Sequence, residues 1–151
     1  MKQMMWQVFF LLLNFSALGI GSWLMNNEPN SDWYLTLNKA PWTPPGWVFG
    51  VAWTTIMICF STYLSYLVNI KVSNMFWLLF IIQFILNVSW NFVFFNQHAI
   101  GFGLIVIMLL TVLIGYYLFN FVTEMGLKSL LIAPYFVWLL IATSLNAYSF
   151  F

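Results

Sequence analysis

The residues of this sequence that could do chemistry are neutral amides and indoles spaced at the period of an α-helix. Gln83, Asn87 and Asn91 recur every four residues and so line one helix face, with Trp90 beside it. Because an amide in an apolar medium costs free energy unless it is hydrogen-bonded, this face must lie against protein or a polar cavity. Amides and indoles offer hydrogen bonding and ring stacking, which is the chemistry of ligand binding.

A second helix face near the end of the chain has the same character. Its members are Tyr135, Trp138, Ala142 and Asn146, which share one side of a helix by their spacing. A small alanine among larger neighbours would leave a recess on that face. Trp53, about 30 residues before the first face, is the third indole that could point inward.

Two interpretations of these faces stay open. In one, the amides hold neighbouring helices together by hydrogen bonds. In the other, Trp53, Trp90 and Trp138 wall a flat apolar pocket in which the amides orient a ligand. Nine tryptophans in 151 residues, several of them away from the expected membrane interfaces, are consistent with the pocket.

Other kinds of chemistry lack the residues they need. The single Cys59 excludes an intramolecular disulfide and a multi-thiolate metal site, and the single His98 excludes a zinc site built from histidines. A hydrolytic triad would depend on His98, which has no acid near it in the sequence. We therefore expect no catalytic residue, no metal ligand and no required cofactor. A net charge of +1 without arginine also gives no surface for nucleic acid.

The composition requires a membrane around the elements that position these residues. Apolar residues make up 64% of the chain and charged residues 5%, against about 25% charged in soluble domains. Five apolar stretches of roughly 20 residues each are long enough to cross a bilayer as helices. They are residues 4–25, 47–68, 75–95, 100–122 and 129–150. The expected fold is an all-α, five-transmembrane-helix bundle in a single domain, 1–151.

The interiors of these stretches carry no charged residue, which argues against ion pumps, voltage sensors and proton-coupled transporters.

The first stretch follows Lys2 and could be read as a signal peptide. It is longer than a typical signal core and no clear cleavage site follows it, so we interpret it as a helix. Gly46 with Gly50, and Ala17 with Gly21, are small pairs that permit close helix approach, although such pairs often arise by chance.

The connection between the first two stretches, residues 26–45, is long and rich in aromatic residues. Trp33, Tyr34 and Trp42 are not typical of a disordered linker. The prolines in Pro41-Trp42-Thr43-Pro44-Pro45 favour a stiff, extended path. We interpret the segment as a structured loop that forms a lid over the bundle. The alternative is a set of aromatic anchors at the level of the lipid headgroups.

An odd number of spans puts the two termini on opposite sides of the membrane. The amino-terminal side collects Lys2, Lys71 and Lys128 against Glu124. We expect a multi-pass protein of a bacterial plasma membrane, and for a plasma-membrane protein the positive-inside rule predicts that the N-terminus lies in the cytoplasm.

Three segments carry a family resemblance. They are WYLTLNKAPWTPPGWVFGVAW (33–53), QFILNVSWNFVFF (83–95) and PYFVWLLIATSLN (134–146). In this order they resemble the translocator protein family, also called tryptophan-rich sensory proteins or peripheral-type benzodiazepine receptors. The resemblance extends over nearly the whole chain.

The resemblance implies a five-helix bundle, often a homodimer, with a ligand cavity beneath the first loop. Family members bind porphyrins such as protoporphyrin IX and haem, and synthetic isoquinolines and benzodiazepines; animal members also bind cholesterol. The family's ligand-binding positions correspond to Tyr34, Trp42, Pro44, Trp53, Asn87, Trp90, Asn91, Trp138, Ala142 and Leu145.

The sequence departs from the family pattern at a few positions. The family commonly reads K-P-x-W, whereas this chain has Lys39-Ala40-Pro41-Trp42, so the loop is expected to follow a different path near Trp42. Met57 and Val106 stand where many members have a tyrosine and an acidic residue. No basic residue follows Tyr148, so the family's sterol-type motif is missing.

The leading hypothesis is a membrane receptor or sensor that holds a porphyrin in an aromatic cavity. One alternative is light-dependent oxidative porphyrin degradation, proposed for similar bacterial proteins, in which Trp53 or Trp138 would donate an electron to the excited ring. The other is transport of tetrapyrroles or lipophiles. Such transport is usually associated with inverted repeats and broken helices, and the odd span count argues against it.

Overall fold

The computed structural model describes residues 1–151, and its regular elements are all helical. Five long helices account for most of the chain: α1 (Lys2–Met25), α3 (Gly46–Lys71), α4 (Asn74–Asn91), α5 (Ile100–Asn120) and α7 (Ala133–Phe150). Short helical segments connect them: η1 (Glu28–Asn30), α2 (Asp32–Thr36), the π-helical turn η2 (Phe92–Asn96), α6 (Val122–Met125) and η3 (Gly126–Leu131). The predicted all-α bundle with a structured first loop is confirmed.

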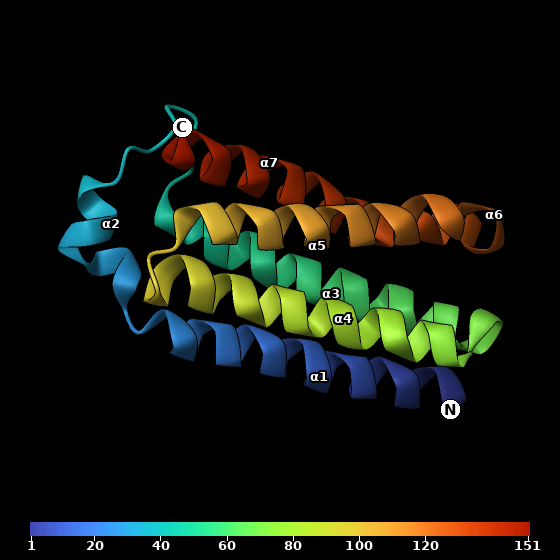
Figure 1. The fold of residues 1–151 in the computed structure, drawn as a ribbon. Helices are drawn as coiled ribbons and strands as arrows, with labels where there is room; N and C mark the ends of the chain where they lie inside the picture. Colours follow the sequence, from blue (N-terminus) through green and yellow to red (C-terminus); the bar gives the residue numbers. More distant parts are fainter.

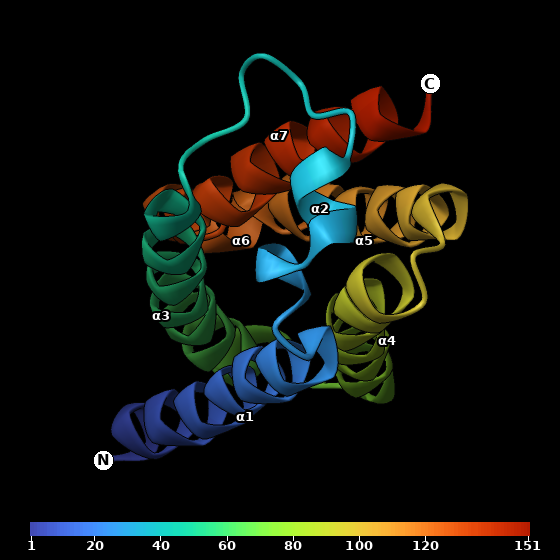
Figure 2. The same cartoon turned by 90° about the vertical axis from the view of Figure 1, so that its left-hand side faces the viewer.

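The five long helices form a closed ring. Helix α1 packs against α3 and α4, α5 packs against α4 and α7, and α3 meets α7 to complete the ring. Figure 2 shows α2 lying across one end of this ring. The two termini lie at opposite ends of the bundle (Figure 1), as an odd number of crossings requires.

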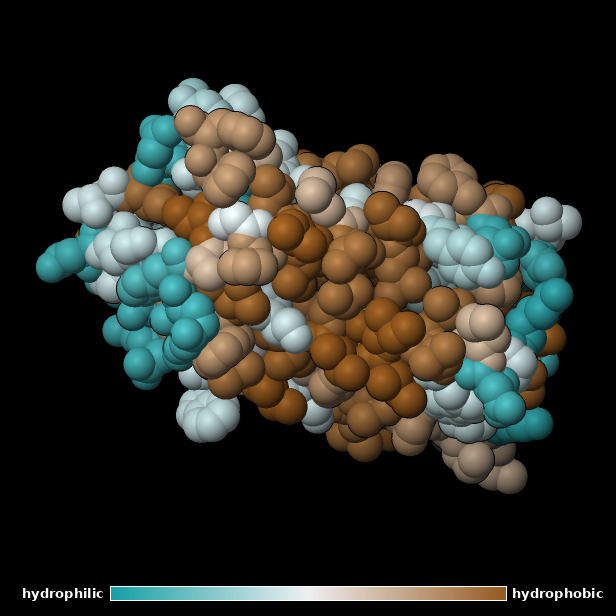
Figure 3. Space-filling view, in the orientation of Figure 1, coloured by the Kyte–Doolittle hydropathy of each residue, from teal (hydrophilic) through white to brown (hydrophobic).

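Four of the helices, α1, α3, α4 with η2, and α5, are long and apolar enough to cross a membrane. The fifth candidate is the segment 122–131 together with α7, and these two parts meet at an angle of 70°. Pro134 lies in the first turn of α7, where its missing N–H breaks no helical hydrogen bond, so α7 starts later than the expected residue 129. On the face seen in Figure 3, a hydrophobic band lies between two polar ends, as expected for a bundle in a bilayer.

Helix α1 is attached to α3 by a row of polar side chains that the sequence analysis did not identify. Asn14 donates to the Ser61 hydroxyl at 2.8 Å and Gln7 to the Thr62 hydroxyl at 2.8 Å. Measured energies of such bonds in membrane bundles average about 0.6 kcal/mol. They fix the register of the two helices in the half of the bundle away from the lid.

The lid, residues 26–45, begins where α1 stops. Asn26 and Asn27 adopt left-handed conformations, φ 50° and 61°, which turn the chain back over the bundle. Ser31 then caps α2 by accepting a hydrogen bond from the Tyr34 backbone N–H at 3.2 Å. The lid is therefore folded, and its aromatic residues have fixed neighbours.

His98, in the connection between η2 and α5, holds the amino-terminal half of the lid. Its Nε2 lies 3.0 Å from the Glu28 carboxylate, and its ring stacks on Trp33 with the ring centres 4.0 Å apart. No acidic residue is near His98 in the sequence, but in the folded chain the Glu28 carboxylate is its neighbour. Glu28 lies 70 residues earlier in the chain and reaches His98 only because the lid folds over the bundle.

Candidate ligand-binding site

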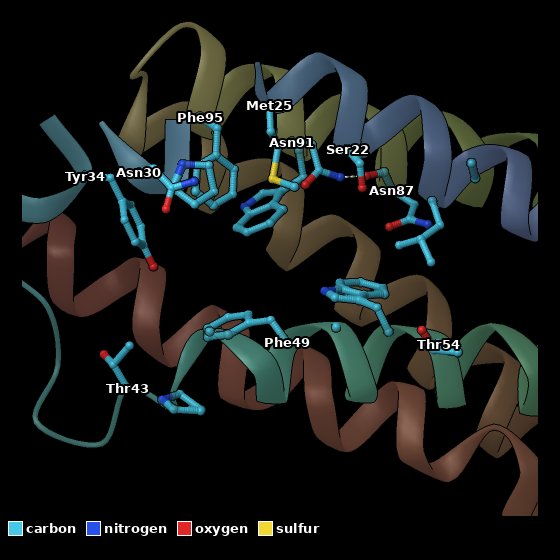
Figure 4. Close-up of a pocket in the computed structure, with 18 of the residues that line it drawn as sticks. Ser22, Met25, Asn30, Tyr34, Thr43, Phe49, Thr54, Asn87, Asn91 and Phe95 are labelled. Atoms are coloured by element: carbon cyan, nitrogen blue, oxygen red, sulfur yellow. Dashed lines mark hydrogen bonds between the residues drawn. The ribbon is translucent and has the colours of Figure 1, made fainter. Parts of the chain in front are cut away.

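A cavity of about 550 Å³ lies beneath the lid, in the size range of small-molecule sites. Helices α1, α3 and α4, the turn η2 and the lid contribute its walls, and Figure 4 shows several of these side chains pointing into it. The lining residues are Ala17, Leu18, Ser22, Met25, Pro29, Asn30, Tyr34, Lys39, Thr43, Pro44, Gly46, Phe49, Gly50, Trp53, Thr54, Asn87, Trp90, Asn91 and Phe95.

Of the amides of α4, one joins neighbouring helices by a hydrogen bond and two line a cavity, so both interpretations from the sequence apply to this face. Gln83 is buried and donates to the Tyr135 hydroxyl at 2.7 Å, so it joins α4 to α7. Asn87 and Asn91 line the cavity instead, one and two turns closer to the lid. Asn91 donates to the Asn87 backbone carbonyl at 3.3 Å, whereas the Asn87 side chain makes no hydrogen bond to protein. Its donor and acceptor are therefore free for a ligand.

Two of the three predicted indoles line the cavity. Trp53 comes from α3 and packs edge-on against Tyr135, with ring centres 6.0 Å apart. Trp90 comes from α4, where its Nε1 donates to the Asn146 Oδ1 at 3.0 Å and its ring stacks on Phe94. With its indole N–H already bonded, Trp90 offers a ligand the surface of its ring.

Trp138 and Trp42 lie outside the cavity lining, in contrast to the expectation for an indole-walled pocket. Trp138 is buried behind Phe49, which lines the cavity and meets the indole edge-on with ring centres 5.3 Å apart. Trp42 is 54% exposed and donates to the Ser144 hydroxyl at 3.1 Å, which ties the lid to α7. Their direct contact with a ligand remains a prediction.

A smaller cavity of about 40 Å³ adjoins the first on the side of α7. Ala142 and Leu145 line it, together with Tyr34, which borders both spaces. The recess expected beside Ala142 is therefore this small cavity. Pro44 and Tyr34 line the main cavity, so the lid contributes to the site as the resemblance implied.

The two small pairs noted in the sequence behave differently. Gly21 lets α1 come close to α4, since a Cβ built on it would lie 2.6 Å from the Asn91 Nδ2. Gly46 and Gly50 face no other helix. Both line the cavity, and a Cβ on either would meet nothing within 4 Å. This pair makes room in the site and does not mediate helix contact.

Sequence reasoning missed the contribution of α1, whose cavity residues are Ala17, Leu18, Ser22 and Met25. The small residues Ala17 and Gly21 were a signal for close packing, but nothing in the sequence pointed to a cavity there. Phe49 and Thr54 of α3 were also missed.

Burial raises the pKa of the Tyr34 hydroxyl in the lid above its ordinary value of 10, so it remains a hydrogen-bond donor at neutral pH.

Comparison of the sequence with known proteins finds a family and several relatives. The family model described as the TspO/MBR family matches residues 5–151. The tryptophan-rich protein TspO of Chlorobaculum tepidum is 33% identical over 86% of this chain and 85% of its own. The tryptophan-rich sensory protein of Cereibacter sphaeroides is 30% identical over 76% of this chain and 73% of its own. The human translocator protein is 29% identical over 84% of this chain and 78% of its own.

Proposed function

The chain belongs to the TspO/MBR family, and from this membership and the cavity beneath the lid we propose that it is a membrane receptor for flat, largely apolar molecules of the porphyrin class. The observation that carries the proposal is the convergence of Trp53, Trp90 and the unbonded Asn87 amide on one cavity.

The physical basis is burial of a large apolar surface with a few directed polar contacts. Burial contributes about 25 cal/mol per Å² of apolar surface removed from water. Offset or edge-on packing against the two indoles adds about 0.5–1.5 kcal/mol per ring pair. Asn87 supplies a donor and an acceptor that set the orientation of the ligand.

The first test is a titration of the purified protein in a neutral detergent with protoporphyrin IX, followed by the absorption bands of the porphyrin. We expect saturable binding, and we expect Trp53→Ala to weaken it about tenfold because one wall of the cavity is lost. Trp47→Ala is the matched control, since Trp47 lies on the same helix, is 71% exposed and does not line the cavity. Equal affinities in both variants would remove Trp53 from the site.

Light-dependent porphyrin degradation is a second candidate, favoured by the two indoles that line the cavity. An excited porphyrin bound there would take an electron from Trp53 or Trp90, and dissolved dioxygen would be the oxidant that accepts electrons and supplies oxygen as the ring is cleaved. Illumination of the complex should then bleach the porphyrin bands more slowly in Trp90→Phe than in the parent. The same rate in both would indicate simple bleaching without a role for Trp90.

We also propose that the end with Lys2, Lys71 and Lys128 faces the cytoplasm of a bacterium. Lys71 pairs with Glu124 at 3.3 Å there, and Lys128 lies over the ring of Tyr66. The lid and the cavity would then face the opposite side of the membrane. The homodimer that the resemblance implies remains a prediction, which cross-linking in native membranes can check.

A further inference from the structure

Lys39 is the one charged residue that lines the cavity, and it also lines the smaller cavity beside it. All other lining residues of both cavities are neutral. Charges interact more strongly in a partly enclosed, apolar space than in water. A single cation at such a place therefore determines which charge on a ligand the site favours.

The ammonium group of Lys39 has an aromatic neighbour in place of an ion-pair partner. Its Nζ lies 4.2 Å from the centre of the Tyr34 ring, close enough for a cation–π contact. A charge-assisted hydrogen bond to a carboxylate is stronger than this contact, and an ammonium group can donate three hydrogen bonds. Lys39 is thus held at the cavity while its capacity to bind an anion is unused.

The three acidic residues of the chain do not neutralise Lys39. Glu28 pairs with His98, and Glu124 pairs with Lys71 at the far end of the bundle. Asp32 begins α2, is exposed, makes no ion pair and does not line the cavity. No carboxylate of the protein therefore forms a salt bridge with Lys39.

The two ends of the cavity differ in chemistry. Figure 4 shows Tyr34 and Thr43 at the lid end, and Asn87 and Thr54 at the other. Lys39 lies over Tyr34 and so belongs to the lid end. A ligand with one charged end and an apolar body can therefore bind in only one orientation that satisfies both ends.

Resting on the proposed function, we propose that Lys39 recognises the ligand as an anion. The ligand class is a flat aromatic carboxylate. Its ring system lies between Trp53 and Trp90, and its carboxylate accepts hydrogen bonds from the Lys39 ammonium group at the lid end. Lys39 is then the residue that distinguishes a free acid from its uncharged ester.

The test compares protoporphyrin IX with its dimethyl ester, which has the same ring system without the charges. Dissociation constants for both ligands are measured in neutral detergent with the parent, Lys39→Gln and Lys2→Gln. Acid and ester partition differently into micelles, but this difference does not depend on the protein variant. It therefore cancels when the variants are compared. Lys2→Gln is the matched control, because it removes the same charge from the opposite end of the bundle.

The preference is the dissociation constant of the ester divided by that of the acid. We expect this ratio to fall about fivefold in Lys39→Gln, which corresponds to the loss of a partly exposed ion pair of roughly 1 kcal/mol. It should stay unchanged in Lys2→Gln, and Lys39→Arg should retain it because the charge is kept. Ester binding by Lys39→Gln shows that the cavity is still folded.

An equal preference in the parent and in Lys39→Gln overturns the role of Lys39, while binding of both ligands leaves the proposed function intact. Loss of the preference in Lys39→Arg as well as in Lys39→Gln also overturns it, because charge is then not the cause. If the parent binds neither ligand, the proposed function fails and this inference fails with it.

Discussion

Gly21 and Asn91 set how closely α1 approaches α4 beside the cavity. The Asn91 side chain occupies the space that a side chain at position 21 would need, and it lines the cavity on its other side. Tight packing of this kind tolerates added atoms poorly, since overpacking costs about 1–3 kcal/mol. The shape of the site therefore depends on a residue that never touches the ligand.

Gly21→Ala should displace Asn91 and weaken porphyrin binding about tenfold, with a lower midpoint of thermal unfolding. Gly19→Ala is the matched control, because a Cβ there meets nothing within 4 Å, and alanine raises helix propensity. Absorption titrations and thermal unfolding in the same detergent measure both effects. If Gly21→Ala binds as tightly as Gly19→Ala, Asn91 is not held by this contact.

Among the tryptophans, function depends on the direction in which each ring points. Trp53 and Trp90 line the cavity, whereas Trp138 supports it from behind Phe49. Trp42 fastens the lid through Ser144. Apart from the direct contact predicted for them, substitutions at Trp42 and Trp138 are therefore expected to change ligand binding through the lid and through Phe49, respectively.

Among the elements, the lid covers the cavity, and a contact between charged residues helps to hold it there. Its amino-terminal half is held by Glu28 and Trp33 on His98, and its other half by Trp42 on α7. Hydrogen bonds from the Ser31 side chain and from His98 lower the pKa of the Glu28 carboxyl below its ordinary value of 4.5. The ionised carboxylate is thus the form that keeps the lid closed.

The sign of the pH dependence follows from that lowered pKa. A group whose pKa is lower in the folded state stabilises the fold above its ordinary pKa, and this stabilisation is lost as the pH falls through the lowered value. Opening of the lid should therefore increase as the pH falls below about 4.5, the ordinary pKa of this carboxyl. Hydrogen exchange of residues 28–36 as a function of pH measures it.

Glu28→Gln should exchange fast over the whole range and lose this pH dependence, because the amide carries no charge to lose. Asp32→Asn, which removes a neighbouring exposed acid that makes no ion pair, should behave as the parent. If the hydrogen-exchange protection of residues 28–36 in the parent, corrected for the intrinsic pH dependence of exchange, stays constant down to pH 3, Glu28 has no role in closing the lid.

In the whole molecule, the decisive question is how many times the chain crosses the membrane. Four helices pass as single spans, and the fifth crossing requires the bent pair formed by 122–131 and α7. The structure supports five crossings, because the N- and C-termini lie at opposite ends of the bundle. With four crossings, both termini would lie on the same side.

Reporter fusions in a bacterial host test this arrangement. A fluorescent protein that matures only in the cytoplasm should be bright at the N-terminus. Alkaline phosphatase, which is active only outside the cytoplasm, should be active at the C-terminus. Activity patterns that put both ends on one side would exclude five crossings, and the reverse pattern would invert the proposed orientation.

From the amino-acid sequence alone, the membrane environment, the helices and the residues that share a face of α4 can be predicted. Charged residues are too few for a water-soluble surface, which places the chain in a membrane. Because backbone groups in a bilayer must be hydrogen-bonded within the segment, the five apolar stretches are predicted to be helices. Helical periodicity also placed Asn87, Trp90 and Asn91 together, because residues three and four apart share a face whatever surrounds the helix. The three motif segments indicated the family, which the match over residues 5–151 confirms.

Which neighbour each helix face meets depends on how the helices pack, and sequence patterns do not show it. Periodicity fixes the direction of a side chain relative to its own helix, but not which neighbour lies there. Gln83 therefore bonds Tyr135, while Asn87, one turn further on, borders a cavity. The pairing of Glu28 with His98, 70 residues apart, depends on the lid folding back over the ring of helices, a long-range contact that local patterns do not encode.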